Sequence, residues 1–362
     1  MPQRPVTIQE SDPPMPNSLH VSLIGDGAMA TVLALLLESK GFNVTLWGAF
    51  PEHVAELIQT RENRRYLPGY RLPDRIVITS DDSRAMKGAN LIVNAVPTQF
   101  IRPVWDRLKP HVPGGVPIAS IAKGIETDTA LRPTQIIADV LQSAGPGSPD
   151  DPDRPARPLA AISGPSVADE LARCLPATVC AASDDADFAR MLQQVFTTHW
   201  FRVYTNPDLL GTELAGATKN VIALAAGILD GLQAGNNAKS ALLSRGLAEI
   251  TRLGVAMGAS QETFFGVAGV GDLATTCFSP TGRNRTCGEQ LGRGRKLQEV
   301  LEEVPGVVEG VPTTKAVVGL AQKYRVEMPI TQAVHQVLFD GMDPLEAISM
   351  LMNRELKPEK IG

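Results

Sequence analysis

The chain has 362 residues, of which 43% are hydrophobic and 20% charged, and its formal net charge is −5. This length is enough for two domains that each bury a core, and the composition is typical of globular proteins. The mildly negative balance argues against a nucleic-acid surface or a polybasic membrane patch. Any anionic ligand must therefore be bound by locally placed lysines and arginines.

Four cysteines, at positions 174, 180, 277 and 287, are too few to staple a chain of this size and include no C-x-x-C pair. We expect reduced thiols in or near the core, and neither cysteines nor histidines show metal-ligand spacing. Residues 1–18 are rich in proline and polar residues without the apolar region of a signal peptide, which predicts a disordered tail. No apolar stretch is long enough for a membrane span, so we expect a cytoplasmic protein.

The first elements follow the order strand, helix, strand. An apolar run over 19–24 indicates a buried strand, a helix is expected over 29–40 with Gly41 after its end, and a second strand over 43–47. Further short apolar runs occur at 75–79, 90–95, 117–121, 159–162 and 178–181. Strands alternating with helices predict a doubly wound, mostly parallel sheet, a Rossmann domain over 19–205.

Two regions depart from this alternation. Residues 145–158 are dense in proline, glycine and aspartate, which predicts an exposed insertion loop. After residue 205 the segments are helix-like, and we assign 206–358 to an all-α substrate and catalytic domain. Its expected helices cover 208–232, 238–257, 284–304, 312–323, 328–340 and 344–353.

A glycine loop follows the first predicted strand. Gly25-Asp-Gly27-Ala28-Met29-Ala30 fits G-x-G-x-x-G/A, in which the glycines allow a tight turn and close backbone approach to a pyrophosphate on the helix N-terminus. A simple glycine turn is the alternative, but the position in a βαβ unit favours a nicotinamide dinucleotide. The second strand ends in Trp47-Gly-Ala49-Phe50, without an acid for a ribose hydroxyl or a cation for a 2′-phosphate. The sequence therefore leaves NAD and NADP open.

Polar residues follow two later strands. Lys123 lies just after the strand at 117–121, and we expect it at the carboxyl end of the sheet, where α/β proteins bind ligands. Gly164 and Ser166 follow the strand at 159–162, where they bring backbone N–H groups to a ligand or merely cap a helix. A surface lysine and a helix cap are the alternatives to function here.

The helix around Gly211–Asn220 is rich in glycine and alanine, so it can pack closely and lie in the interior. Lys219 within it would then be desolvated, which lowers its pKa toward the range useful for acid–base chemistry. Asp272, in a glycine-rich connection, is a candidate partner for it, and Arg283 offers a planar fork for a phosphate. A snorkelling lysine, a turn aspartate and a solvated arginine are the alternatives.

Several of these segments together resemble one family. They are Ile121-Ala-Lys-Gly-Ile-Glu126, Ser163-Gly-Pro-Ser166, Phe201-Arg-Val-Tyr204, Gly216-Ala-Thr-Lys-Asn-Val221, Ser244-Arg-Gly-Leu-Ala-Glu249, Gly271-Asp-Leu273, Arg283-Asn284 and Val308-Glu-Gly310. The chain is similar to bacterial NAD(P)-dependent glycerol-3-phosphate dehydrogenases over residues 19–355, which implies interconversion of glycerol 3-phosphate and dihydroxyacetone phosphate for phospholipid synthesis. Whether such a chain forms a homodimer is left open by the sequence.

The resemblance implies roles for individual residues. Lys219 would be the general acid–base, held by Asn220 and Asp272 with Thr276 nearby, and Lys123 would contact both substrate and nicotinamide. The implied substrate contacts are Lys123, Gly164, Ser166, Lys219, Asp272, Arg283 and Asn284. The implied cofactor contacts are Gly25, Gly27, Ala28, Met29, Ala30, Ala49, Lys123, Ala168, Arg283, Val307 and Glu309.

The chain departs from the family pattern at three places. Ala28-Met29 stands where serine and an aromatic residue are frequent, Ala49 replaces an arginine or histidine, and Gly282 replaces a serine before Arg283. The first two changes affect cofactor affinity and preference, whereas the proton-transfer residues are intact. A related hydroxyacid dehydrogenase and a non-catalytic dinucleotide-binding redox sensor are the alternatives; the Arg283-Asn284 pair argues against the first and the intact Lys219 against the second.

Overall fold

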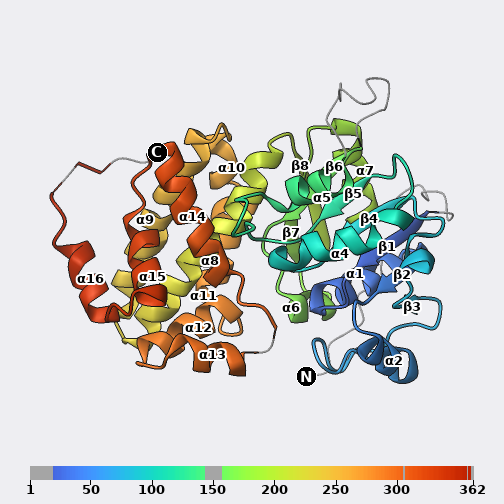
Figure 1. Ribbon diagram of the computed structural model, residues 1–362, viewed down its shortest axis with the longest axis horizontal. Helices are drawn as coiled ribbons and strands as arrows, with labels where there is room; N and C mark the ends of the chain where they lie inside the picture. The colour runs from blue at the N-terminus through green and yellow to red at the C-terminus, as the bar shows by residue number, and fades with distance from the viewer. Residues whose placement is uncertain (1–18, 143–156, 305, 357, 360–362) are drawn as a thin grey trace.

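The computed structural model describes residues 19–142, 157–304, 306–356 and 358–359. It forms two regions, a sheet covered by helices and a bundle of helices, which lie side by side along the long axis in Figure 1. The predicted tail and most of the predicted insertion loop lie outside the described residues. Within the described residues no helix is both long and apolar enough to cross a membrane.

The sheet has eight strands in the order β3-β2-β1-β4-β5-β6-β7-β8, and all neighbours are parallel except β6 and β7. The strands are β1 His20–Ile24, β2 Asn43–Trp47, β3 Val77–Thr79, β4 Leu91–Asn94, β5 Ile118–Ser120, β6 Leu159–Ser163, β7 Ala177–Ala182 and β8 Phe201–Asn206. This confirms the doubly wound, mostly parallel Rossmann sheet.

Helices cover both faces of this sheet (Figure 1). They are α1 Ala28–Ser39, α2 Pro51–Thr60, α3 Asp82–Met86, η1 Thr98–Phe100, α4 Ile101–Leu108, η2 Lys109–His111, α5 Pro133–Leu141, α6 Ala168–Ala172 and α7 Ala186–Phe196. Successive strand residues point to opposite faces, so Leu23 joins one apolar cluster and Ile24 the other. The near-continuous apolar strands of the sequence follow from this double covering.

The helical region is built around α8 Leu209–Gly231, which packs against its neighbours in the bundle and also against β6 of the sheet. The other elements are α9 Gly235–Ala256, α10 Gln261–Phe265, the π-turn η3 Val267–Gly271, α11 Asp272–Phe278, α12 Arg283–Gly292, α13 Leu297–Glu303, α14 Gly310–Tyr324, α15 Pro329–Phe339 and α16 Pro344–Met352. The described part after residue 206 is thus all-helical, as the sequence predicts.

Small residues let α8 and α12 pack backbone to backbone. A Cβ atom added at Gly227 would lie 2.0 Å from the carbonyl oxygen of Arg285, and one at Gly288 would lie 2.0 Å from that of Leu224. Only glycine fits at such a crossing. The prediction that the glycine- and alanine-rich helix lies in the interior is confirmed, because most residues of α8 are buried.

Two predictions about the helical region are wrong in detail. The single helix predicted over 284–304 is two helices, because the chain turns at Gly294, whose φ of +86° favours glycine. The sequence predicts no helix over residues 261–278, whereas the structure forms α10, η3 and α11 there, so Asp272 begins a helix. Cys180, Cys277 and Cys287 are buried as expected, whereas Cys174 is exposed.

Candidate active site

Lys219 lies in the middle of α8 and is only 6% exposed. Its ammonium donates hydrogen bonds to Asp272 Oδ1 at 2.5 Å and to the hydroxyl of Thr276. Thr276 in turn donates to the backbone carbonyl of Asp272 at 2.7 Å, which fixes the hydroxyl as an acceptor for the lysine. The lysine is therefore not a snorkelling surface residue but a buried, oriented cation.

Asp272 is shared by two lysines. Its Oδ2 accepts a hydrogen bond of 2.7 Å from Lys123, which follows β5 at the carboxyl end of the sheet. Lys123 also donates to the carbonyl of Gly164 at 2.9 Å and to the Ser166 hydroxyl at 3.2 Å. The structure thus joins residues from the β5 end, the β6 end, α8 and α11 around one carboxylate.

This clustering shifts proton affinities. Burial lowers the pKa of Lys219 to about 8, with Asp272 opposing the shift and Lys123 adding to it. Burial alone would raise the pKa of Asp272, but the two neighbouring ammonium groups hold it below its usual value. A lysine that loses its proton near neutral pH beside a fixed carboxylate has the properties of a general acid–base.

Ser166 does not cap a helix. Helix α6 begins at Ala168 after Val167, and no side chain caps its N-terminus. The Ser166 hydroxyl instead donates to the carbonyl of Gly164 at 2.9 Å and accepts from Lys123. Gly164 has a φ of +138°, and an added Cβ would lie 2.9 Å from the Cα of Val179, so this elbow requires glycine.

A chain of amides extends from the lysines to α14. Asn220 donates to the carbonyl of Lys123 at 2.8 Å and accepts from Asn284 at 2.8 Å. The Asn284 oxygen accepts from the backbone N–H of Gly310 at 2.8 Å. Asn284 is therefore held on both sides by the protein, and its backbone N–H lies in the first turn of α12, whose N-terminus no side chain caps.

Arg283 begins α12 and is exposed. A Cβ added at Gly306 would lie 2.9 Å from Nη1 of Arg283, so its guanidinium lies against the segment before Val307 and Glu309. The N-cap of α12 is Gly282, which supplies no side-chain hydrogen bond. An arginine at an uncapped helix N-terminus suits a phosphate.

Glu309 links the two regions of the chain. Its Oε1 accepts a 2.8 Å hydrogen bond from the backbone N–H of Thr98, and burial raises its pKa to about 7 with Thr98 and Arg283 opposing the shift. A Cβ added at Gly124 would lie 2.7 Å from Glu309 Oε2. The carboxyl therefore sits against the backbone that carries Lys123.

Sequence reasoning missed Thr98. It lies after β4, and the same rule that singled out Lys123 would have found it, because β4 ends at the same edge of the sheet as β5. Sequence reasoning also missed Glu213 of α8, whose carboxylate accepts from Arg132 and from the Thr134 N–H at 2.9 Å. This buried contact joins the two regions and has no local sequence signature.

The glycine loop has the geometry of a dinucleotide site. Gly25 has a φ of +116° and lies so close to Ala95 that a Cβ would be 2.9 Å from its carbonyl oxygen. No atom lies within 4 Å of a Cβ position at Gly27, the N-cap of α1, and no side chain caps that helix. Open space in front of free N–H groups fits a pyrophosphate.

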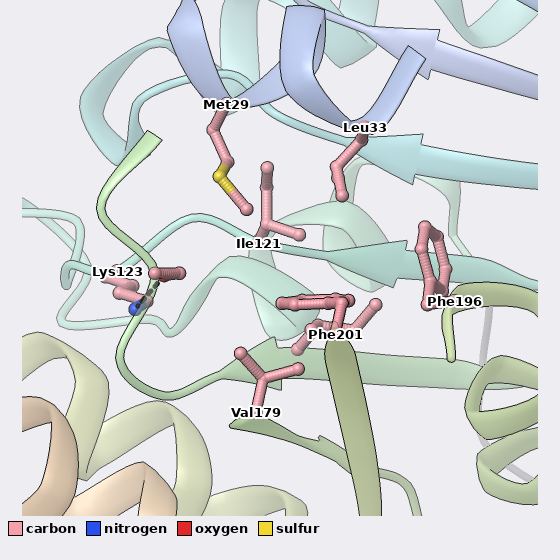
Figure 2. Close-up of a pocket in the computed structure, with 9 residues that line it drawn as sticks. Met29, Leu33, Ile121, Lys123, Val179, Phe196 and Phe201 are labelled. Atoms are coloured by element: carbon pink, nitrogen blue, oxygen red, sulfur yellow. Dashed lines mark hydrogen bonds between the residues drawn. The ribbon is translucent and has the colours of Figure 1, made fainter. Parts of the chain in front are cut away.

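A pocket lies between α1, the helix that follows this loop, and Lys123. Figure 2 shows Met29 and Leu33 of α1 on one side of it and Lys123 at one end, with Phe201 and Val179 beneath. Its lining is mostly apolar, and Ser166 belongs to it as well. Ala28 and Ala30 lie in the same turn of α1, Ala168 begins α6, and the carbonyl of Ala49 accepts from Arg107 at 3.2 Å.

This arrangement defines a Rossmann-fold dehydrogenase class: a glycine loop for a dinucleotide, an apolar pocket with Lys123 at its polar end, and a carboxylate that joins Lys123 to the buried Lys219. Within the described residues no cluster of three or more potential metal ligands occurs. Models of the two halves of one family match the chain, the NAD-dependent glycerol-3-phosphate dehydrogenase N-terminus at residues 20–189 and its C-terminus at 208–349. The chain therefore belongs to the NAD-dependent glycerol-3-phosphate dehydrogenase family.

Curated relatives agree with this assignment. The glycerol-3-phosphate dehydrogenase [NAD(P)+] of Citrifermentans bemidjiense is 46% identical over 341 residues, which cover 94% of this chain and 99% of the relative. The protein of the same name from Geobacillus kaustophilus is also 46% identical, over 94% of this chain and 96% of the relative.

Solved structures share the architecture. The glycerol-3-phosphate dehydrogenase of Coxiella burnetii superposes with a TM-score of 0.87 at 37% identity, covering 94% of this chain and 100% of that one. A D-mandelate dehydrogenase superposes with a TM-score of 0.60 at 13% identity over 91% of this chain and 100% of that one, which shows a shared fold alone.

Proposed function

We propose that this chain is an NAD(P)-dependent glycerol-3-phosphate dehydrogenase that interconverts sn-glycerol 3-phosphate and dihydroxyacetone phosphate. The observation that carries the proposal is the pair of lysines on Asp272, buried Lys219 and half-buried Lys123, beside the α12 N-terminus that carries Arg283. The first group suits proton transfer at a carbonyl, and the second suits a phosphate on the same small molecule. Supply of glycerol 3-phosphate for phospholipid synthesis would be the metabolic role.

In the direction of ketone reduction, the Lys219 ammonium donates its proton to the substrate's carbonyl oxygen, and water returns the proton afterwards. A bound nicotinamide supplies the hydride at the carbon. Lys123 stabilises the negative charge that develops on that oxygen, and Asp272 keeps both ammonium groups in place. Asn220 orients the backbone of Lys123, and Thr276 accepts from Lys219, so both act by positioning.

The substrate phosphate would lie at the N-terminus of α12. Arg283 provides a planar cation, and the first N–H groups of the helix, including that of Asn284, provide donors. Fixing the phosphate places the carbonyl carbon near Lys219, Gly164 and Ser166, and positioning of this kind contributes several kcal/mol, roughly 7–11 kcal/mol in the best cases, to the rate. Room for a hydroxyl remains at Gly282, whose Cβ position has its nearest neighbours at 3.5 Å.

The cofactor would span the glycine loop and the apolar pocket. Gly25, Gly27 and the first turn of α1 suit the pyrophosphate, and the pocket beside Met29 suits the flat face of a nicotinamide ring. The remaining proposed cofactor contacts are Ala28, Ala30, Ala49, Lys123, Ala168, Arg283, Val307 and Glu309. Val307 and Glu309 are included because Gly306, just before them, lies against Arg283, and Glu309 itself lies against Gly124.

One assay tests the function. Purified protein is mixed with dihydroxyacetone phosphate and NADH or NADPH, and the loss of reduced-nicotinamide absorbance is followed. Turnover with at least one cofactor is expected, and glyoxylate, pyruvate and ketopantoate serve as unphosphorylated controls. Turnover of an unphosphorylated ketoacid alone would favour the related hydroxyacid dehydrogenase, and cofactor binding without any turnover would favour the redox sensor.

We further propose that 19–205 and 206–358 are separate domains, that the protein is cytoplasmic, and that it assembles as a homodimer. Separate apolar clusters in the sheet and helical regions support the division. The exposed side chains of Leu345 and Met352 in α16 offer apolar surface for an assembly contact. Sedimentation of the purified protein tests the assembly, and limited proteolysis tests the boundary.

A further inference from the structure

The end of β2 lacks the acidic side chain that usually binds the adenosine ribose in this fold. The strand ends at Trp47 and continues through Gly48, Ala49 and Phe50, of which Gly48 is buried and Phe50 exposed. Gly48 has no side chain to offer, and the Ala49 side chain is a methyl group. The structure nevertheless places a carboxylate at this point.

That carboxylate belongs to Asp26 of the glycine loop. An ideal Cβ built on Gly48 would lie 2.3 Å from Asp26 Oδ2 and 2.9 Å from Asp26 Cγ. The Asp26 side chain therefore occupies the space that a side chain at the end of β2 would occupy. The Asp26 carboxylate fits at this point because residue 48 is glycine and has no side chain.

The loop is fixed in the position that aims this side chain. Asn63 donates to the backbone carbonyl of Asp26 at 2.8 Å and to the Thr31 hydroxyl of α1 at 2.8 Å. The Asn63 oxygen accepts from the backbone N–H of Tyr66 at 3.2 Å. Asn63 itself is fully buried, so the backbone of Asp26 is tied to α1 and to the segment after α2.

Two polar atoms at this point lack hydrogen-bond partners within the described residues. Asp26 Oδ2 and His53 Nε2 are buried, 3.8 Å apart, and neither makes a hydrogen bond. Burial raises the pKa of Asp26, while the charges of His53 and Arg65 oppose the shift. A buried carboxylate oxygen without a donor is costly. The Asp26 side chain as a whole is 15% exposed, so a ligand hydroxyl that reached the carboxylate would offset part of that cost.

We propose that Asp26 is the ribose-binding acid of this chain and makes it prefer NAD over NADP, with His53 as its positioning residue. A ribose 2′-hydroxyl donates to the carboxylate, whereas a 2′-phosphate would face a fixed negative charge at the same place. The inference rests on the proposed dehydrogenase function and adds cofactor discrimination to it.

The cations near this point do not reverse the preference. Arg107 approaches Ala49, but its guanidinium is bound by both carboxylate oxygens of Asp82 at 2.7 Å. Arg65 is exposed and stacks over the ring of Tyr66, 5.1 Å from its centroid. A 2′-phosphate would have to displace one of these arrangements while it remained beside Asp26.

Equilibrium binding tests the inference without requiring turnover. NADH and NADPH are titrated separately into the whole protein, and nicotinamide fluorescence gives the two dissociation constants. The wild-type protein is expected to bind NADH at least about tenfold more tightly than NADPH, the effect of one hydrogen bond to a charged group. Asp26→Asn and Asp26→Ala should each reduce that ratio by about tenfold or more, through weaker NADH binding, tighter NADPH binding, or both.

Asp106→Asn is the matched control, because it removes one negative charge from an exposed position on α4 and should leave the ratio unchanged. A wild-type ratio near one, an unchanged ratio in both Asp26 variants, or equal weakening of the two cofactors would overturn the inference and leave the dehydrogenase function intact. Failure of the wild-type protein to bind either cofactor would instead overturn the proposed function.

Discussion

The lysine cluster and the glycine loop differ in whether their buried polar atoms have hydrogen-bond partners. In the cluster, Lys219, Lys123 and Asp272 satisfy one another through hydrogen bonds of 2.5 and 2.7 Å before any ligand arrives. At the loop, Asp26 and His53 each have a buried side-chain atom without a hydrogen-bond partner, and the space in front of Gly27 is open. This difference indicates that the polar groups of the lysine cluster are preorganised, whereas those of the loop would be satisfied only by a bound dinucleotide of the kind proposed above.

The largest expected effect comes from removing the central cation. Lys219→Met should lower turnover of dihydroxyacetone phosphate by about 100-fold to 10,000-fold, the usual contribution of a positioned general acid. Cofactor dissociation constants should stay within about twofold of wild type, because the loop is independent of the cluster. Lys323→Met, at an exposed position in α14, is the control that should retain full activity. A Lys219→Met enzyme with most of its activity would refute the acid–base role.

The same lysine predicts opposite pH profiles for the two directions. Ketone reduction needs the ammonium form, so its rate should fall as pH rises through about 8, the pKa to which burial lowers Lys219. Alcohol oxidation needs the neutral amine, so its rate should rise over the same interval, by up to about tenfold per pH unit below the pKa. Initial rates in both directions between pH 6 and about 10 would show this, and two profiles that move together would contradict it.

Removing the Asp272 carboxylate, which both lysines share, should lower the free energy of unfolding if the cluster is preorganised. Asp272→Asn leaves the buried ammonium of Lys219 and the half-buried ammonium of Lys123 without a counter-charge, which should cost about 3–5 kcal/mol in the free energy of unfolding. Urea denaturation measures the loss, with Asp106→Asn as a surface control. If Asp272→Asn were as stable as the control, the cluster would not be the preformed unit that the comparison describes.

Removing the cation at the proposed phosphate site should have a smaller effect, mainly but not only on substrate binding, because Arg283 is also a proposed cofactor contact. Arg283→Ala removes a cation at the α12 N-terminus, and KM for dihydroxyacetone phosphate should rise about tenfold to 100-fold, the range for one hydrogen bond to a charged group. Arg293→Ala, at the other end of the same helix, is the control. A rise in KM for the cofactor alone would assign Arg283 to the dinucleotide instead.

The two regions also differ in how far the sequence reveals them. Periodicity and the rule that ligands bind at strand ends identify the Rossmann sheet, the glycine loop and Lys123, because these follow from local pattern. The pairing of Asp272 with both lysines depends on three elements that meet in space. The helices within 261–278 are only five to seven residues long, which is too short to show helical periodicity. Asp26 was visible in the loop motif, but its relation to Gly48 follows only from the three-dimensional approach of loop and strand.

The smallest effect is expected from the packing of α12 against α8, the helix that carries Lys219. Gly288→Ala would place a Cβ 2.0 Å from the carbonyl oxygen of Leu224, one turn from Lys219 and Asn220 on α8, so α12 must move away. We expect a loss of about 1–3 kcal/mol in unfolding free energy, as for other overpacked cores. Gly319→Ala is the matched control on α14, where nothing lies within 4 Å, and it should stabilise by up to about 1 kcal/mol through helix propensity.

Because Asn284 of α12 bonds to Asn220, Gly288→Ala should also lower turnover while NADH binding at the distant loop is unchanged. Equal losses of turnover and NADH affinity would show instead that the two parts of the site respond as one.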